Sequence, residues 1–401
     1  MTGPPEPGFE QRGAAQLSGR QTSVKTIALS FLLILAVAGF QGQAPKAPNS
    51  AASTSASTVP VSGPFSVEEL QHFTALAPID THTHVFKKSP AFYATLTKLN
   101  LHVLNILVDD DTIPEYADFA KEAEEAGEVV DGSHGSVTLG STFDAYKFSQ
   151  PDFSAEAIRK LNQDFARGAV AVKFYKVVGM EIKDAKGNYV MPDDPVFEPI
   201  FKDIAAHSKT LVAHVADPDS AFEAPNPAAP DYEYLMHHPE LYMYGKAGAP
   251  TKAEILKARD HILEENPTLR MVGAHLGSME SNLNELGRHF DQYSNFAVDL
   301  AGRMPYFELQ PRAAAIEFIT RYQDRLIYGT DNELYPADDA QVTMTDWEST
   351  YANEWRYLAT NDTILYKNKP VQGLALPHSI LRKLYHDNAV KWFPGILGAT
   401  P

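Results

Sequence analysis

Short apolar runs alternate along the chain with longer stretches in which apolar residues recur at helical spacing. Several of the short runs are continuous strings of aliphatic and β-branched residues, which is typical of parallel strands covered on both faces. The pattern predicts eight strands, at residues 77–79, 103–108, 136–139, 169–174, 211–215, 270–274, 296–300 and 326–329.

The stretches between these runs predict amphipathic helices. Residues 154–167 place apolar side chains at Ala157, Ile158, Leu161 and Phe165, the spacing of one helical face. Capping-box sequences at 66–69 and 251–254 predict helix starts, and the first of them marks the beginning of the folded domain. This alternation of strands and helices fits either a (β/α)₈ barrel or an open doubly wound sheet.

Polar residues at the ends of four predicted strands distinguish these two folds. His82 and His84 follow the first strand, His214 ends the fifth, His275 the sixth and Asp331 the eighth. A barrel brings all of its strand ends to one face, whereas an open sheet leaves its first and last strands far apart. The sequence therefore predicts an α/β fold of the (β/α)₈ TIM-barrel type, with one site built from these residues.

The chemistry of this set indicates a metal site. In the sequence His82-Thr83-His84 the two imidazoles share one side of an extended strand, because side chains alternate with period two. Two histidines and a carboxylate with open coordination positions are typical of a catalytic metal, which activates a bound water and polarises a carbonyl. Asp331 can take the proton from that water, ligate the metal, or do both in turn.

Composition narrows the alternatives. The chain of 401 residues has no cysteine, so any metal must be held by His, Asp or Glu. A hydrophobic fraction of 44% supports a sizeable core, and a net charge of −17 argues against nucleic acid or anionic lipid as partners. A small-molecule substrate remains, and local Arg or Lys residues allow it to be an anion.

The N-terminal region predicts export. A basic flank ending at Lys25 precedes an apolar run of residues 27–40, and small residues follow it, as in a cleaved secretory signal over residues 1–44. The alternative is a retained membrane anchor. Residues 45–64 are rich in Ala, Ser, Thr and Pro and predict a disordered linker, which leaves residues 65–401 as a single barrel domain. We expect a periplasmic or secreted protein without stable membrane association after cleavage.

On these motifs the chain resembles the amidohydrolase superfamily, specifically its amidohydrolase-2 branch of aminocarboxymuconate- and resorcylate-type decarboxylases, hydrolases and hydratases. The pieces that carry the resemblance are IDTHTH (79–84), GAVAVK (168–173), AH (213–214), GAHLG (273–277), YGTD (328–331) and HDNA (386–389). They extend over most of the chain from about residue 77 to residue 395.

The resemblance implies roles for the strand-end residues. It places His82, His84, His214 and Asp331 on one divalent metal, usually zinc, and His275 beside it, positioning substrate or transferring protons. Relatives with two metals carry a carboxylated lysine after the fourth strand, where this chain has Lys173. We expect one metal, and for Lys173 a substrate-carboxylate or structural role rather than a bridging one. Relatives are often dimers, so a homodimer is expected as well.

Further residues are candidates for substrate contact. Arg303 follows the seventh strand, and its guanidinium suits a substrate carboxylate, although an ion pair with Asp299 or a loop carboxylate is an equal alternative. Residues 217–250 follow the fifth strand and predict a lid, because loops after barrel strands lie on the catalytic face. The tyrosines expected to line this lid are Tyr232, Tyr234, Tyr242 and Tyr244.

These predictions lead to three hypotheses of function. The leading one is metal-dependent hydrolysis of a C–N or C–O bond in a small substrate, with Asp331 as base and His275 holding the developing charge. The alternative is a lyase, in which the same metal site orients a carboxylated substrate for non-oxidative decarboxylation. A third is an exported, non-catalytic binding protein that kept the barrel, against which the complete His and Asp set argues.

Overall fold

The computed structural model describes residues 60–111, 116 and 118–398. The predicted signal segment and residues 45–59 of the predicted linker lie outside the described residues, so the signal, the linker and export stay predictions. Within the described ranges, no helix combines the length and the apolar character needed to cross a membrane.

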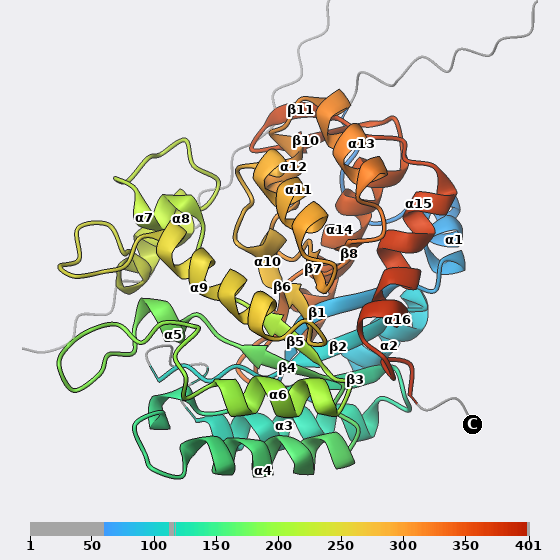
Figure 1. Ribbon diagram of the computed structural model, residues 1–401. Helices are drawn as coiled ribbons and strands as arrows, with labels where there is room; N and C mark the ends of the chain where they lie inside the picture. Colours follow the sequence, from blue (N-terminus) through green and yellow to red (C-terminus); the bar gives the residue numbers. More distant parts are fainter. Residues whose placement is uncertain (1–59, 112–115, 117, 399–401) are drawn as a thin grey trace, which may run out of the picture. The chain divides into compact units, whose positions relative to one another are not determined.

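Strands β1 to β9 form one parallel sheet (Figure 1). From β1 to β8 each strand pairs with the next one in sequence, and β9 pairs with the other edge of β1. The burial of β1, β2, β4, β5 and β7 is complete on both faces, as parallel strands require. Their bounds are β1 Ile79–Val85, β2 His102–Ile106, β3 Val137–Ser141, β4 Ala171–Phe174, β5 Thr210–Ala213, β6 Arg270–Gly273, β7 Phe296–Asp299, β8 Leu326–Ile327 and β9 Asn332–Leu334.

Residues 326–334 close this sheet into a barrel. Their first part, β8, pairs with β7, and their last part, β9, pairs with β1. Between the two strands the backbone N–H of Asp331 donates to the carbonyl of His82 (2.9 Å), and the N–H of Thr81 donates to the carbonyl of Tyr328 (3.1 Å). The predicted (β/α)₈ barrel is therefore confirmed.

The first strand lies later in the chain than the sequence pattern predicts. The expected strand at residues 77–79 is wrong except for Ile79, because Ala77 has a φ of 45° and cannot lie in a strand. The polar residues that we expected after the strand are part of it. Asp80 is satisfied there by Thr330 and Tyr351, whose hydroxyls donate to Oδ2 at 2.6 and 2.7 Å.

Helices cover the outside of the barrel, with α3, α4 and α6 in a layer along one side of the strands (Figure 1). Both predicted capping boxes are present, at Ser66 before α1 and Thr251 before α9. The helices are α1 Val67–Ala75, α2 Pro90–Leu99, α3 Phe119–Gly132, α4 Phe153–Ala166, α5 Val177–Met180, α6 Glu198–Ala206, α7 Asp219–Phe222, α8 Tyr232–His237, α9 Lys252–Glu265, α10 Ala274–Gly277, α11 Leu283–Gln292, α12 Met304–Glu308, α13 Arg312–Arg321, α14 Ala340–Ala359, α15 His378–Arg382 and α16 Asn388–Trp392.

The long segment after the eighth strand is mostly not a loop. It forms α14 and a hairpin of β10 (Thr363–Tyr366) and β11 (Lys369–Gln372). Trp347 and Trp355 of α14 are buried, and the ring of Trp347 lies 5.8 Å from that of Phe92 on α2. These buried tryptophans therefore stabilise the packing of α14.

The barrel interior is filled by strand side chains and closed at the amino ends of the strands by α16. Trp392 and Phe393 belong to the same buried cluster as Ile79, Val170 and Ile327. The amide of Asn388 donates to the carbonyl of Leu326 (2.7 Å), which fixes the start of the helix against the barrel. The opposite end, where the strands finish, is left for the functional site.

We predict that Trp392→Ala destabilises the domain by about 3–5 kcal/mol, because it leaves a cavity at the closed end of the barrel. Differential scanning calorimetry of the full chain measures the change. The neighbouring exposed residue provides the control, since Val390→Ala should stay within about 0.5 kcal/mol of wild type. Equal effects of the two substitutions would contradict the role of Trp392 as the closing side chain.

Candidate functional site

The two histidines of β1 are held so that Nε2 of each is turned toward Asp331. His82 Nδ1 lies 2.8 Å from Asp299 Oδ2, and His84 Nδ1 lies 2.8 Å from the carbonyl of Ile106. An ionised carboxylate and a carbonyl can only accept, so each Nδ1 carries the proton. The Nε2 lone pairs of both imidazoles are therefore available to a ligand.

Asp331 lies between these two nitrogens. Its Oδ1 is 3.4 Å from the Nε2 of His82 and 3.4 Å from the Nε2 of His84. Ligands bound at about 2.0–2.1 Å in a tetrahedral zinc site are separated by about 3.4 Å. Asp331 Oδ1 therefore lies at the spacing of a shared metal ligand from each imidazole, and the barrel closure that bonds Asp331 to the backbone of His82 places it there.

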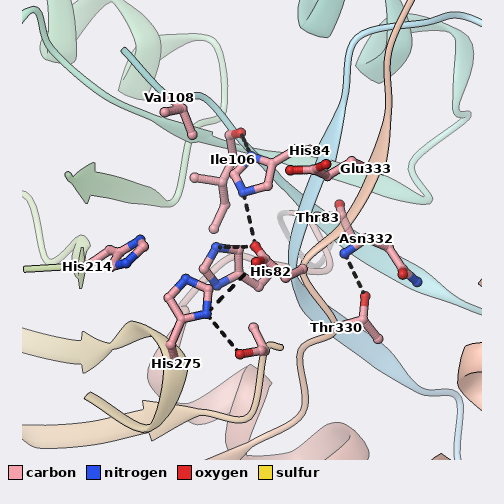
Figure 2. Close-up of polar contacts among 12 residues, drawn as sticks. His82, Thr83, His84, Ile106, Val108, His214, His275, Thr330, Asn332 and Glu333 are labelled. Atoms are coloured by element: carbon pink, nitrogen blue, oxygen red, sulfur yellow. Dashed lines mark hydrogen bonds and ion pairs between the residues drawn. The ribbon is translucent and has the colours of Figure 1, made fainter. Parts of the chain in front are cut away.

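The other two predicted histidines lie beside this group, and Figure 2 shows His275 turned toward His82 with His214 further to the side. One potential ligand atom each from His82, His275 and Asp331 lies within 4.8 Å of the others, a spacing that could hold a metal. The ring centroid of His214 is 4.3 Å from that of His275. Its buried Nε2 makes no hydrogen bond among the described residues, and Asp217 Oδ1 lies 3.5 Å from it.

A strained turn presents His275. Four consecutive residues from His275 to Ser278 have φ between 58° and 61°, a left-handed conformation that costs about 1–3 kcal/mol for a non-glycine residue. Gly277 is required in this turn, because a Cβ there would lie 2.9 Å from the Phe296 ring. The His275 Nδ1–H donates to the carbonyl of Ala301 (2.8 Å), which holds the imidazole in place.

The protonation states suit metal binding. Burial lowers the pKa of His82 and holds those of His214 and His275 well below the ordinary value, so all three imidazoles are neutral near pH 7. Burial alone would raise the pKa of Asp331, but its interactions with the polar groups of the cluster hold it well below its usual range. Neutral imidazoles and an ionised carboxylate are the forms that bind a divalent cation.

Lys173 points into the same group from the end of β4. Its Nζ lies 2.8 Å from His82 Nε2, and burial lowers its pKa to about 8. A metal on His82 would compete for the lone pair that this amine uses. Metal binding there therefore requires the amine to release the hydrogen bond, which leaves it free to contact a substrate.

A cavity of about 470 Å³ opens over these residues. Four of the predicted site histidines and acids line it directly, namely His84, His214, His275 and Asp331, and Lys173 and Arg303 line it as well. The Arg303 guanidinium is not paired with Asp299, which binds His82 instead. The nearest carboxylate to Arg303 is that of Asp231, at 4.0 Å, and its buried Nε has no hydrogen-bond partner in the described part of the chain.

The segment predicted as a lid contributes part of the cavity wall. Tyr234 lines the cavity, together with Asp231 and His238 from the same segment. The other three predicted tyrosines, Tyr232, Tyr242 and Tyr244, are not among the lining residues, and Tyr244 is 55% exposed. The segment thus lies at the cavity, with one of the four tyrosines facing into it.

Several residues at the cavity were not singled out by the sequence pattern. Lys176 lies three positions after Lys173 and forms a buried ion pair with Asp217 (2.6 Å), and Glu333 and Tyr335 follow Asp331. The sequence signal that could have identified Lys176, Asp217, Glu333 and Tyr335 is their position shortly after a strand. The cavity wall also includes Tyr116, for which the sequence offers no comparable signal.

Fold and site together define an α/β-barrel protein with a His and Asp cluster at the carboxyl ends of its strands. The amidohydrolase family model Amidohydro_2 matches residues 79–395, which is most of the chain. The chain therefore belongs to the amidohydrolase family, as its motifs predicted. This is a family of metal-dependent enzymes, and the matched region contains every residue of the cluster.

Solved structures similar to this chain have low sequence identity to it. A 2,6-dihydroxybenzoate decarboxylase from Rhizobium is 12% identical over 78% of this chain and 98% of its own, with a TM-score of 0.45. A 5-carboxyvanillate decarboxylase from Novosphingobium aromaticivorans, solved with manganese, is 14% identical over 79% and 95%, with a TM-score of 0.43. A dihydroorotase from Campylobacter jejuni is 11% identical over 78% and 82%, with a TM-score of 0.40. No curated protein matches the sequence.

We predict that Asp299→Asn lowers the affinity for a divalent metal about 10–100-fold. The amide would present an N–H to His82 Nδ1, which forces the imidazole into the tautomer that carries its proton on Nε2 and cannot ligate. Isothermal titration of the metal-free protein with zinc measures the affinity. Asp291→Asn, at an exposed ion pair on α11, is the control, and an Asp299 variant that binds like it would refute the tautomer argument.

Proposed function

We propose that the protein is a metal-dependent, non-oxidative decarboxylase that acts on a small carboxylated substrate. The observation that supports this most is Arg303, a buried guanidinium that lines the cavity beside the His and Asp cluster with its Nε unpartnered. A buried donor without a partner is costly, and a carboxylate is the group that a guanidinium fork binds best. The lyase therefore replaces the hydrolase that the sequence analysis favoured.

Lys173 adds a second cationic group on the same cavity. Burial keeps its pKa near 8, so the amine is protonated at neutral pH, and it lies next to His82 within the cluster. Two cations near one metal site match an anionic substrate, whereas hydrolysis of a neutral ester or amide needs neither of them. The charge distribution supports the lyase over the hydrolase.

We place one ion on His82, His84, His214 and Asp331, and zinc suits three imidazoles and a carboxylate. When bound, the metal supplies positive charge that draws electron density away from the reacting carbon. Arg303 orients the carboxylated substrate. The C–C bond to the carboxylate breaks, its electron pair stays on the substrate carbon, and CO₂ leaves.

The vacated carbon must then receive a proton. His275 lines the cavity, and its Nδ1 is occupied by the carbonyl of Ala301, so Nε2 is the nitrogen that can exchange protons with the cavity. We assign it the transfer of a proton from solvent to that carbon. The strained turn at His275 holds the imidazole in the position from which Nε2 would transfer the proton.

The test is to incubate the zinc-loaded full chain in D₂O with a panel of aromatic and unsaturated carboxylic acids and with matched esters and amides. We expect release of CO₂ from at least one acid, with one deuterium at the vacated carbon, and no cleavage of the esters or amides. Hydrolysis of an ester or amide without CO₂ release would contradict the proposal.

For an acid that reacts, Arg303→Met should raise KM about tenfold or more, because it keeps the aliphatic stem and removes the charge-assisted hydrogen bonds to the carboxylate. Steady-state kinetics gives the value. Arg321→Met, at an exposed ion pair on α13, should behave as wild type. An unchanged KM in the Arg303 variant would remove the guanidinium from the substrate site.

A further inference from the structure

One wall of the cavity is acidic and aromatic, in contrast to the cationic groups around Arg303 and Lys173. It is formed by Glu333, Tyr116 and Tyr335, which all line the cavity. The Tyr116 hydroxyl donates to Glu333 Oε1 (2.9 Å), and the Tyr335 hydroxyl lies 2.6 Å from that of Tyr116. Figure 2 shows Glu333 beside His84, on the side away from His214 and His275.

The hydrogen bonds of this wall leave it with acceptors only. Tyr116 has a single hydroxyl proton and donates it to Glu333, so Tyr335 must be the donor in the contact between the two phenols. Both hydroxyl protons are thus used inside the cluster. The lone pairs that remain, on two phenol oxygens and one carboxylate, can only receive hydrogen bonds from a ligand.

Among the described residues, Glu333 has no ion pair with a cationic side chain. Asp217 pairs with Lys176 (2.6 Å) and Asp231 lies 4.0 Å from Arg303, but no Lys, Arg or His nitrogen of the described residues lies within 4.0 Å of the Glu333 carboxylate. The positions next to Tyr116 that the structure does not describe, 112–115 and 117, are Thr, Ile, Pro, Glu and Ala, none of them cationic. An ammonium group of a ligand could therefore approach the Glu333 carboxylate without displacing a cationic side chain, and it would gain a charge-assisted hydrogen bond there.

Aromatic rings surround the same place. The ring centroids of Tyr116 and Tyr335 are 5.9 Å apart, and that of Phe86 lies 6.3 and 6.0 Å from them. Ring faces attract cationic nitrogen, and clusters of aromatic rings with a carboxylate are a common way to bind ammonium groups. The backbone is fixed as well, because Glu333 lies opposite His84 in the β1–β9 register and its carbonyl accepts from Trp347 Nε1 (3.1 Å).

We infer that Glu333, Tyr116 and Tyr335 form a subsite for a cationic nitrogen of the substrate, a protonated or alkylated amine. This inference rests on the proposed function for the carboxylate end of the substrate. The substrate class is then a small acid that carries a carboxylate toward Arg303 and an ammonium group toward Glu333. Of the residues in the cluster, Glu333 supplies the charge and the phenols supply acceptor oxygens and ring faces.

The test compares the affinity of the zinc-loaded full chain for 4-(aminomethyl)benzoate and 4-ethylbenzoate, which have nearly the same shape and differ in the charged nitrogen. We expect the aminomethyl acid to bind about tenfold more tightly by NMR titration, because it gains a charge-assisted hydrogen bond. The corresponding 3-(aminomethyl)benzoate and 3-ethylbenzoate are compared in the same way. Glu333→Gln should abolish the preference for the amine while leaving the affinity for the ethyl acids within about twofold of wild type.

Two further variants test whether the preference for the amine depends on the position of the lost charge and on the phenol hydroxyls. Glu317→Gln removes one negative charge from an exposed position of α13 and should keep the preference. Tyr116→Phe with Tyr335→Phe keeps the rings and should reduce the preference only partly. Equal binding of both acids to wild type would overturn the inference and leave the proposed function standing. Binding of neither acid would contradict the proposed carboxylate pocket and the inference with it.

Discussion

The hydrogen bond from the Asp331 N–H to the carbonyl of His82 joins the last strand segment of the barrel to the first. Both the closure of the sheet and the assembly of the site depend on this hydrogen bond. Without this contact the carboxylate at the end of the chain's eighth strand would not lie 3.4 Å from the Nε2 of both His82 and His84. The fold thus places residues some 250 positions apart in the sequence around one point.

The site carries polar groups that are costly to bury, and the barrel compensates for them in two ways. Asp299 binds His82 through one oxygen and the backbone N–H of His275 through the other, so a single buried carboxylate orients two imidazoles. Asp80, which is buried in β1, accepts hydrogen bonds from the hydroxyls of Thr330 and Tyr351. His214 and Arg303, each with a buried nitrogen that makes no hydrogen bond among the described residues, line the cavity where a metal and a substrate carboxylate would bind.

Much of this could be predicted from the sequence. Continuous aliphatic runs separated by amphipathic stretches predict alternating strands and helices. The polar residues His82, His84, His275 and Asp331 at the strand ends then favour the barrel over an open sheet, because a barrel brings its strand ends to one face. The carboxyl end of β1 was missed because polar residues satisfied by distant partners look like the end of a strand. Tyr116 and the pairing of Asp299 with His82 depend on contacts between elements far apart in sequence, and no local pattern encodes them.

We propose that the cluster at the carboxyl ends of the strands holds one divalent metal. Metal analysis of the full chain after loading with zinc, for wild type and His82→Ala, tests it most directly, with His261→Ala on the exposed face of α9 as control. The account predicts about one equivalent in wild type and in the control and almost none in His82→Ala. Wild type that binds no metal after loading, or a His82 variant that keeps the full equivalent, would contradict it.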